Sequence, residues 1–427
     1  MPKIVKYKNR IADDLLQRRL QGKGAILIEG PKWSGKTTTA KQMAGSILDL
    51  GDVSVLQEAQ QDFQMQPKKL LEGNVPRLID EWQTMAVLWD MVRSEVDRRQ
   101  DVGQFILTGS SVPPDQELMI HSGTGRIGRL RMRTMSLWES GESTGSVSVK
   151  DLFDGNDIGT PENHLDIEQI AFLICRGGWP KSTMLNANAA LDEAIDYYEA
   201  IYNVDILRVD KIRRSSERTR LLLRSYARNQ GTAISFEKMC KEIFDNDSKS
   251  ISPETVSDYV DALKKMFVIE DMPAWNPNLR SKVAVQSSDT RYFTDPSMAM
   301  AALGIGPSDL LNDLCSFGLF FETMAVRDLR VYADALDGKV YHYRDSKGLE
   351  CDAVLHRRNG SYGLIEIKLG GLDNIEKGAA TLKQMADKID TTKMPAPSFM
   401  MVMTGVGAYA YRRKDGVYVV PIGCLKP

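Results

Sequence analysis

Apolar positions in the first third of the chain form short runs that alternate with helical patterns. Ile11, Leu15 and Leu20 have the spacing of one apolar stripe on a short helix ahead of the first strand. Strands are predicted over residues 25–28, 53–56, 76–83, 104–111 and 130–132. Helices are predicted over residues 38–50 and 85–99. Alternation of this kind favours an α/β fold with a parallel sheet.

The stretch that follows the first strand fits the pattern G-x-x-x-x-G-K-[ST] at every fixed position. Backbone N–H groups of such a loop point at anionic oxygens, Lys36 reaches the β and γ phosphates of ATP, and the Thr37 hydroxyl holds Mg²⁺. A simple Gly-punctuated turn would need four specified residues and both flanks to agree by accident. The predicted nucleotide-binding residues are Gly30, Pro31, Lys32, Trp33, Ser34, Gly35, Lys36, Thr37 and Thr38.

Two acids end the strand predicted at residues 76–83. Ligands of α/β sheets bind beyond the carboxyl ends of the parallel strands. We therefore expect Asp80 to orient Mg²⁺ or its water, and Glu81 to polarise the water that attacks the γ phosphate. Paired acids are also common at helix starts, but downstream of a phosphate loop the catalytic interpretation is favoured.

The next strand ends in small polar residues, and a Gly-rich segment with two arginines follows it. Ser110 is a candidate sensor of the γ phosphate, with a Ser-rich turn as the alternative. The simplest interpretation of Arg126 and Arg129 is that they are ordinary surface residues. In an ATPase that assembles into a ring, either arginine could instead reach a neighbour's nucleotide and stabilise transition-state charge.

The middle of the chain is predicted to be mostly helical. Residues 139–165 are rich in Gly, Ser and Asp, which predicts a flexible or peripheral insertion. Helices at residues 167–175 and 186–204 would form a small lid. Arg176 between them is a candidate second sensor, but capping of helix carbonyls is the favoured role.

Three further helical patterns precede two short strands. The helices are predicted at residues 217–228, 235–244 and 252–266, and the strands at residues 267–272 and 290–295. This order is that of a helix-turn-helix with a wing, which usually enters the major groove of DNA. Glu254 and Asp258 make the start of the presumed recognition helix acidic, which weakens direct base reading.

The C-terminal part combines a helix with a predicted sheet. Glu322 lies in an apolar helical pattern, Asp352 lies in one strand of a predicted hairpin, and Glu366 and Lys368 share one face of the next strand. Asp352 and Glu366 are hard oxygen ligands for Mg²⁺ or Mn²⁺, while Lys368 would steady hydroxide or the scissile phosphate. Glu322 is a further candidate ligand. The alternative is a hairpin whose polar face is only solvated.

Composition and charge fit a globular protein with several domains. The chain has 427 residues, 42% of them hydrophobic and 26% charged, and a formal net charge of -2. A basic run between residues 208 and 228 is most simply a solvated helix face. Five scattered cysteines and an N-terminus without an apolar core predict a reducing, cytoplasmic location, and no run is long enough to span a membrane.

These motifs together resemble a known family. The phosphate loop, the L-I-D-E-x-Q acid pair, the L-T-G-S strand end and the later G-R pair are similar to AAA-type P-loop ATPases of bacteria and archaea whose C-terminal half is a conserved domain of unknown function. The stretches at residues 176–180, 205–208 and 317–322 are also similar to that family. The resemblance therefore covers nearly the whole chain.

The resemblance implies a fold and its domain boundaries. It implies an AAA+ core at residues 1–140, an insertion and helical lid at 141–210, a winged-helix domain at 211–300, and at 301–427 an α/β domain similar to PD-(D/E)XK nucleases and restriction endonucleases. Glu322, Asp352, Glu366, Lys368 and the helix with Gln384 occur in the order that this nuclease fold uses.

The predicted function is Mg²⁺-dependent ATP hydrolysis coupled to DNA binding or processing by the nuclease-like domain. A homo-oligomeric ring, for instance a hexamer, is expected from the arginines and the resemblance. Two alternatives remain. One is a nucleotide-dependent signalling switch that regulates a protein partner and carries a degenerate nuclease-like scaffold. The other is an ATP-dependent DNA-binding protein without cleavage.

Overall fold

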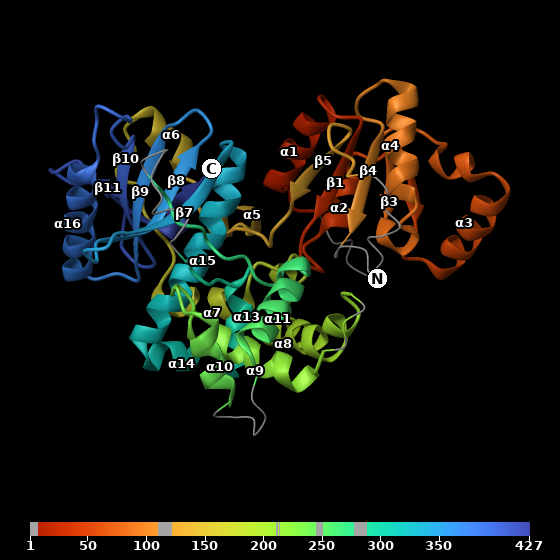
Figure 1. Ribbon diagram of the computed structural model, residues 1–427. Helices are drawn as coiled ribbons and strands as arrows, with labels where there is room; N and C mark the ends of the chain where they lie inside the picture. The colour runs from red at the N-terminus through yellow and green to blue at the C-terminus, as the bar shows by residue number, and fades with distance from the viewer. Residues whose placement is uncertain (1–6, 110–121, 211, 213, 245–250, 277–287) are drawn as a thin grey trace. The chain divides into compact units, whose positions relative to one another are not determined.

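The computed structural model describes residues 7–109, 122–210, 212, 214–244, 251–276 and 288–427 (Figure 1). Its contacts divide the chain into two compact units. The first unit consists of Met1–Thr134, Ile201–Ser216 and Tyr259–Val268. The second unit consists of Met135–Ala200, Glu217–Asp258 and Ile269–Pro427. The four domain boundaries expected from the sequence remain a prediction.

The first unit is built on a parallel five-stranded sheet in the order β2-β3-β4-β1-β5. Its strands are β1 Ala25–Glu29, β2 Ser46–Asp49, β3 Arg77–Asp80, β4 Phe105–Gly109 and β5 Ile127–Arg131. All five strands run in the same direction, so their carboxyl ends meet at one edge of the sheet. The α/β class predicted from the sequence is confirmed.

Helices cover both faces of this sheet. Alternate residues of β1 point to opposite faces, and both sets are buried. Ile26 and Ile28 pack with α1 Ile11–Leu20, as the apolar stripe predicted. Ala25 and Leu27 belong to a second core with α4 Leu88–Arg99. Two further helices, α2 Lys36–Lys41 and α3 Val53–Met65, complete the layers.

Two sequence-based elements of the first unit are wrong. The helix expected over residues 38–50 ends at Lys41. The strand β2 begins at Ser46, because Gly45 lies against the segment that leads into β3, where its N–H donates to the Pro76 carbonyl at 2.8 Å. The strand expected at residues 53–56 is the first turn of α3. Asp52 caps that helix, since its side chain accepts from the N–H groups of Ser54 and Val55.

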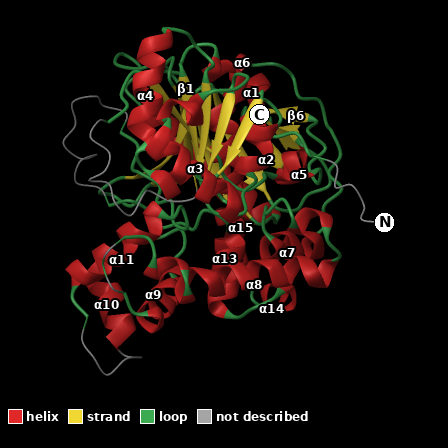
Figure 2. Cartoon of the chain, turned by 90° about the vertical axis from the view of Figure 1, so that its right-hand side faces the viewer, coloured by secondary structure: helices red, strands yellow, loops and turns green. Residues whose placement is uncertain are grey.

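The second unit contains a six-stranded mixed sheet in the order β11-β12-β10-β9-β8-β7. Its strands are β7 Gly338–Arg344, β8 Glu350–Arg357, β9 Tyr362–Lys368, β10 Phe399–Thr404, β11 Tyr411–Arg412 and β12 Tyr418–Pro421. The strands β7, β8 and β9 form an antiparallel meander, and β10 returns parallel to β9. Figure 2 colours the helices of the chain red and its strands yellow, with β1 of the first sheet facing the viewer.

Two long helices belong to this sheet. The helix α15 Leu314–Ala335 lies against β7, β8 and β9. The helix α16 Leu372–Lys388 connects β9 to β10, and its apolar face packs on Val354, Leu364 and Val402 of the sheet. The predicted helix around Glu322 and the predicted strand pair are both present. The meander followed by a crossover helix places the start of β8, the end of β9 and one face of α16 together.

Three further helices of the second unit lie against α15. They are α7 Ile167–Arg176, α13 Pro296–Leu303 and α14 Pro307–Asn312, and α8 Ala187–Asn203 follows α7 in the chain. Residues 139–165, expected to form a flexible or peripheral insertion, contain regular structure in part. Ser136 caps α5 Leu137–Ser140, Ser148 caps α6 Val149–Asp154, and β6 Val147–Ser148 pairs with β13 Leu425–Lys426.

Three helices occupy the middle of the chain, close to their predicted positions. They are α9 Ser216–Arg228, α10 Phe236–Phe244 and α11 Pro253–Lys265. Two antiparallel bridges follow, which pair Ile269 with Phe293 and Met272 with Thr290. In the described part of the chain, no helix is both long and apolar enough to cross a membrane.

Candidate functional sites

The register of the first sheet brings the predicted nucleotide site together at one edge. Glu29 at the end of β1 aligns with Gly109 of β4 and with Arg131 of β5, and Asp80 of β3 aligns with Thr108 of β4. The phosphate loop leaves β1 directly after Glu29. The loop and the acids at the end of β3 therefore emerge side by side at the carboxyl edge, where α/β sheets bind ligands.

The phosphate loop has a conformation that depends on its glycines. Gly35 has a φ of 95°, which a side chain would strain. A Cβ on Gly30 would lie 2.0 Å from the Met132 carbonyl oxygen, so only glycine fits there. The Ser34 hydroxyl donates to the Pro31 carbonyl at 2.9 Å, whereas Trp33 is 51% exposed. Ser34 is buried, so it would contact a nucleotide through its backbone N–H, whereas Pro31 has no N–H and instead shapes the loop through its carbonyl.

Lys36 is buried under the loop that it belongs to. Its Nζ donates to the carbonyl oxygens of Gly30 at 3.0 Å and Pro31 at 2.7 Å. Burial lowers the pKa of Lys36 to about 8, against the opposing attraction of Glu81 and Asp80. An anionic phosphate beside this amine would favour its charged form. Thr38 is exposed on the first turn of α2.

Thr37 and Asp80 meet in the structure, as the sequence predicted. The Thr37 hydroxyl donates to Oδ1 of Asp80 at 2.8 Å, and the Thr108 hydroxyl donates to the same oxygen. A hydroxyl and a carboxylate side by side fit Mg²⁺, which usually takes one or two protein oxygens and completes its shell with water and phosphate. Thr108 was missed as a site residue, although the L-T-G-S pattern contains it.

Glu81 occupies a strained position directly after β3. Its φ of 53° is in the left-handed region, which non-glycine residues adopt rarely and which is often found at functional sites. Burial raises the pKa of Glu81, while the Gln83 side chain, which donates to its Oε2, and Lys36 act in the opposite direction. Gln83 is the last residue of the L-I-D-E-x-Q pattern. It is a positioning residue for the Glu81 carboxylate.

The two candidate arginines differ in their position relative to the phosphate loop of their own chain: Arg126 lies at the far end of the sheet, whereas Arg129 pairs with Glu29, directly before the loop. Arg126 precedes β5, and its carbonyl accepts from Ala25 at the start of β1, the end of the sheet opposite the loop. Its Nε pairs with Asp97 at 2.7 Å. Arg129 lies on the edge strand and pairs with Glu29 at 2.9 Å. Ser110, the candidate sensor, lies outside the described residues.

Two further residues hold the phosphate loop, and sequence reasoning missed them. The buried guanidinium of Arg10 donates to the Ser34 carbonyl and to the Arg133 carbonyl, each at 2.8 Å. No motif marks Arg10. Asp205 in the short helix Asp205–Leu207 pairs with Lys32 of the loop at 2.5 Å. That residue opens the 205–208 stretch, so the family resemblance was the available signal.

Replacing Arg10 by Ala is expected to weaken ATP binding by about tenfold, because a hydrogen bond to a charged group contributes about 1.5–3 kcal/mol. Arg10→Lys should rescue little, since one ammonium cannot reproduce the planar fork that serves two carbonyls. Equilibrium binding of ATP measures both variants. Lys41→Ala, at the exposed end of α2, is the matched control. Unchanged affinity in Arg10→Ala would show that the loop holds its shape alone.

A second polar cluster lies in the second unit, where β8, β9 and α16 meet. The ammonium of Lys368 lies 2.9 Å from Oδ2 of Asp352 and 2.7 Å from Oε2 of Glu366. The same Asp352 oxygen accepts from the Ile367 N–H at 2.7 Å. Glu366 and Lys368 share a face of β9, as predicted. The structure therefore brings together the three residues that the sequence singled out.

Glu322 of α15 adds a third carboxylate to the electrostatics of this cluster. Its Oε1 accepts from the Tyr292 hydroxyl. Burial and the charge of Asp352 raise the pKa of Glu322 to about 8 and that of Glu366 to about 7. Burial acts against the charged form of Lys368, but its attraction to the two carboxylates outweighs this and raises its pKa. One cation thus faces three carboxyl groups, two of which are shifted toward their neutral forms.

The cluster opens into a hollow of about 550 Å³, here called the β9 hollow. Its lining residues are Lys347, Gly348, Leu349, Glu350, Asp352, Glu366, Lys368, Thr381, Gln384 and Lys388. In the described ranges, no three His, Cys, Asp or Glu side chains form a ready metal cage. Asp352 and Glu366 nevertheless fit Mg²⁺ or Mn²⁺, which can be held by two carboxylates with water and phosphate as the other ligands.

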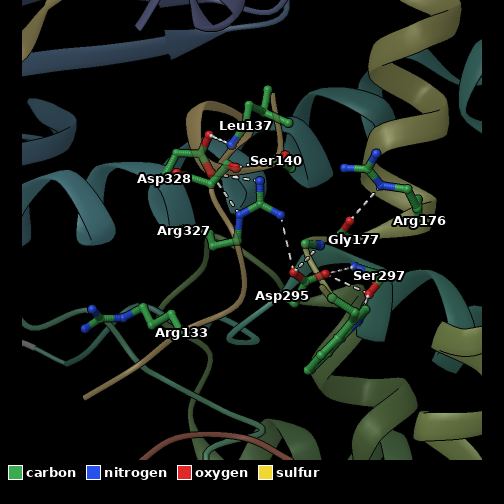
Figure 3. Close-up of polar contacts among 12 residues, drawn as sticks. Arg133, Leu137, Ser140, Arg176, Gly177, Asp295, Ser297, Arg327 and Asp328 are labelled. Carbon is green, nitrogen blue, oxygen red and sulfur yellow. Dashed lines mark hydrogen bonds and ion pairs between the residues drawn. The ribbon is translucent and has the colours of Figure 1, made fainter. Parts of the chain in front are cut away.

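Arg176 takes part in a buried polar network of the second unit rather than in a nucleotide contact (Figure 3). Its Nε donates to the Gly177 carbonyl at 3.0 Å, and its Nη1 pairs with Glu142 at 2.5 Å. Gly177 is the C-cap of α7, so Arg176 has the capping role that was favoured. The second-sensor role has no support from these contacts.

The centre of this network is the fully buried Arg327 of α15. Its guanidinium pairs with Asp295 at 3.3 Å and with Asp328 at 2.7 Å. The Gly178 N–H donates to the Asp295 carboxylate at 2.9 Å, and the Leu137 N–H donates to Asp328 at 3.0 Å (Figure 3). The network joins four segments that lie far apart in the sequence.

Comparison with known families agrees with the N-terminal site. Residues 22–140 match the model of an AAA domain. Residues 167–309 match a domain of unknown function, DUF8612, and residues 317–425 match another, DUF4143. A search of curated proteins found no match.

Two solved structures show a distant likeness. One is a Walker-type ATPase of Pyrococcus abyssi, 15% identical, with a TM-score of 0.44, which covers 70% of this chain and 98% of that chain. The other is the Hef helicase domain of Pyrococcus furiosus, 12% identical, with a TM-score of 0.21, which covers 93% of this chain and 86% of that chain. Residues 22–140 match an AAA domain and contain a phosphate loop between a strand and a helix. This part of the chain is therefore a P-loop ATPase domain of the AAA type.

Proposed function

We propose that the protein hydrolyses ATP in a Mg²⁺-dependent manner and couples this reaction to the binding or cleavage of DNA at a nuclease-like site in its C-terminal part. The convergence of Asp352, Glu366 and Lys368 at the β9 hollow carries the DNA part of the proposal. A purely solvated hairpin face would not bury Glu366 to 4% exposure beside a second carboxylate. The ATPase part rests on the phosphate loop and the AAA match.

At the phosphate loop, each residue has a chemical task. Backbone N–H groups of Gly30 and of residues 32–35, together with the Lys36 ammonium, would bind the phosphates, while Thr37 and Asp80 would hold Mg²⁺, which neutralises phosphate charge. Glu81 would take up the proton of the attacking water, and its raised pKa suits a general base. Gln83 and Thr108 would keep the two acids in place.

At the β9 hollow, Asp352 and Glu366 would hold Mg²⁺ or Mn²⁺, with Glu322 beside them. The bound cation would activate water and offset phosphate charge. Lys368 would then be released from one carboxylate and donate to the scissile phosphodiester. The antiparallel meander, the crossover helix α16 and the parallel strand β10 support a PD-(D/E)XK-like domain.

The middle of the chain supports a winged-helix arrangement. Three helices precede the antiparallel bridges at Ile269 and Met272, which is the order of a helix-turn-helix followed by a wing.

Arg126 and Arg129 are 47% and 55% exposed and have carboxylate partners at the surface, where an ion pair contributes little. Either arginine could exchange that partner for a neighbour's nucleotide in a homo-oligomeric ring.

Cleavage of DNA by the purified protein tests this function. We expect Mg²⁺- or Mn²⁺-dependent cutting of single-stranded, duplex or branched DNA, lost in Lys368→Ala because the remaining carboxylates cannot neutralise the phosphodiester. Lys383→Ala, on the exposed side of α16, is the matched control. Lys36→Ala, compared with and without ATP, shows whether cutting depends on the nucleotide.

The outcomes separate the proposal from its rivals. Cutting that survives Lys368→Ala would refute the nuclease site. Salt-dependent DNA binding without any cutting would favour an ATP-dependent DNA-binding protein. Hydrolysis of ATP that DNA neither changes nor requires, with no DNA bound, would favour a nucleotide-dependent switch acting on a protein partner.

A further inference from the structure

A row of arginines follows one side of α9, in the part of the basic run that the ATPase does not use. Arg220, Arg224 and Arg228 are spaced four residues apart, so they lie along one helix face at steps of about 6 Å. They line a hollow of about 340 Å³, here called the α9 hollow. Arg220 pairs with Glu217 at 2.7 Å. Arg224 and Arg228 are exposed and, within the described ranges, have no ion-pair partner.

A second basic hollow adjoins the first. The α10 hollow, of about 510 Å³, is lined by Lys238, Lys241 and Arg344 and shares Glu242 with the α9 hollow. The Glu242 carboxylate is engaged by the Ser225 hydroxyl at 2.6 Å and by the Asn229 side chain. Positive charge therefore exceeds negative charge along both hollows. Charges of one sign gathered in a concave surface attract a polyanion.

The two basic hollows continue toward the β9 hollow. Arg344 ends β7 and lines the α10 hollow, and its Nε pairs at 2.9 Å with Glu350, which lines the β9 hollow. Lys347, in the same hairpin, lines the β9 hollow as well. The α9 hollow, the α10 hollow and this hairpin form one surface, here called the basic track.

We propose that the basic track binds the phosphate backbone of duplex DNA and delivers it to the β9 hollow. This inference rests on the proposed function of that hollow. Nonspecific contact with duplex DNA is made by Lys and Arg at the phosphates. Single strands are usually gripped by aromatic side chains that stack on the bases, and no aromatic residue lines any of the three hollows in the described part of the chain.

The basic track also explains how this region could bind DNA although the start of the predicted recognition helix is acidic. The first turns of α11 carry Glu254 and Asp258, which repel phosphate. The basic charge of this region lies instead on α9, which carries four arginines and one glutamate, and on the two lysines of α10 that line the α10 hollow. In this arrangement the helices contact the DNA backbone and carry no sequence preference.

Charge reversal on the track tests the inference. Binding of fluorescent duplex DNA by the full chain is measured by anisotropy over a range of salt concentrations, with single-stranded DNA and RNA as separate arms. We expect the double variant Arg224→Glu/Arg228→Glu to bind duplex at least about tenfold more weakly, with a salt slope lower by about 2. The control Arg358→Glu/Lys414→Glu makes the same charge change at exposed positions off the track. Circular dichroism and ATP hydrolysis check that both variants fold.

Equal loss in the track variant and the control would overturn the inference, as would unchanged duplex binding in the track variant. Single-stranded DNA or RNA bound more tightly than duplex would overturn the choice of ligand. Lys368→Ala separates this inference from the proposed cleavage. Duplex binding that needs Arg224 and Arg228, without cutting by the wild type, would leave the track standing and remove the nuclease.

Discussion

Replacing Glu81 by Gln is expected to slow ATP hydrolysis by about 10²- to 10⁴-fold and to leave ATP binding intact. Gln has the size of Glu but cannot accept the proton of the attacking water. Burial already raises the pKa of this carboxyl, the Gln83 side chain donates to it, and Glu81 has a left-handed backbone conformation at the end of β3. Phosphate release under single-turnover conditions gives the rate, and equilibrium titration with ATP gives the affinity.

Two controls make that experiment decisive. Glu58→Gln changes an exposed acid on α3 in the same way and should leave hydrolysis unchanged. Lys36→Ala should weaken binding and hydrolysis together, because it removes a phosphate contact. If Glu81→Gln hydrolyses ATP at the wild-type rate, Glu81 is not the base. Loss of ATP binding in Glu81→Gln would assign it to structure instead.

Replacing Arg327 by Ala is expected to lower the free energy of unfolding by about 3–5 kcal/mol, because it leaves two carboxylates buried without their cation. Arg327 is 2% exposed, and both of its partners, Asp295 and Asp328, are completely buried. Burial raises the pKa of Asp328 to about 6 even with Arg327 beside it. Such a loss is a large fraction of the stability of an ordinary domain. Urea unfolding followed by circular dichroism measures it.

A second variant separates charge from packing in this network. Arg327→Met keeps much of the buried side-chain volume, so it should be as damaging as Arg327→Ala if the unpaired carboxylates dominate. Arg344→Ala removes an arginine from an exposed pair, in which the two side chains are 62% and 54% exposed. That control should cost less than about 1 kcal/mol. A similar cost for Arg327→Ala and Arg344→Ala would contradict the importance of the buried pair.

Burial and neighbouring charges shift the pKa values of Lys36 and Lys368 in opposite directions. Lys36 is buried mainly among backbone carbonyls, so desolvation lowers its pKa to about 8. Lys368 is also desolvated, but two carboxylates lie within 3 Å of its ammonium and raise its pKa. A phosphate bound beside Lys36 would therefore raise its pKa again and favour its charged form. Lys368 retains its charge throughout the range in which proteins are stable.

The sequence alone was enough to predict which residues meet at both candidate sites. The phosphate loop, Asp80 and Glu81 are contiguous or follow an apolar strand, so local pattern was enough to predict them. The pair Glu366 and Lys368 was predicted to share a face from the two-residue period of a strand. Local signals failed where a glycine or a cap outweighed the apolar pattern, as at Gly45, which ends the segment after α2, and Asp52, which starts α3.

Only the tertiary structure decided which distant residues complete these sites. Arg10 and Asp205 reach the phosphate loop from segments that carry no phosphate-binding pattern, and Asp295 meets Arg327 across the second unit. The position of Arg126 could not be predicted from the sequence either, since the parallel register of β5 with β1 places it at the end of the sheet away from its own phosphate loop. Hydrogen bonds and ion pairs between segments depend on how the chain returns on itself. Sequence spacing does not contain that information, because burial and neighbours are set only when the sheets and helices pack.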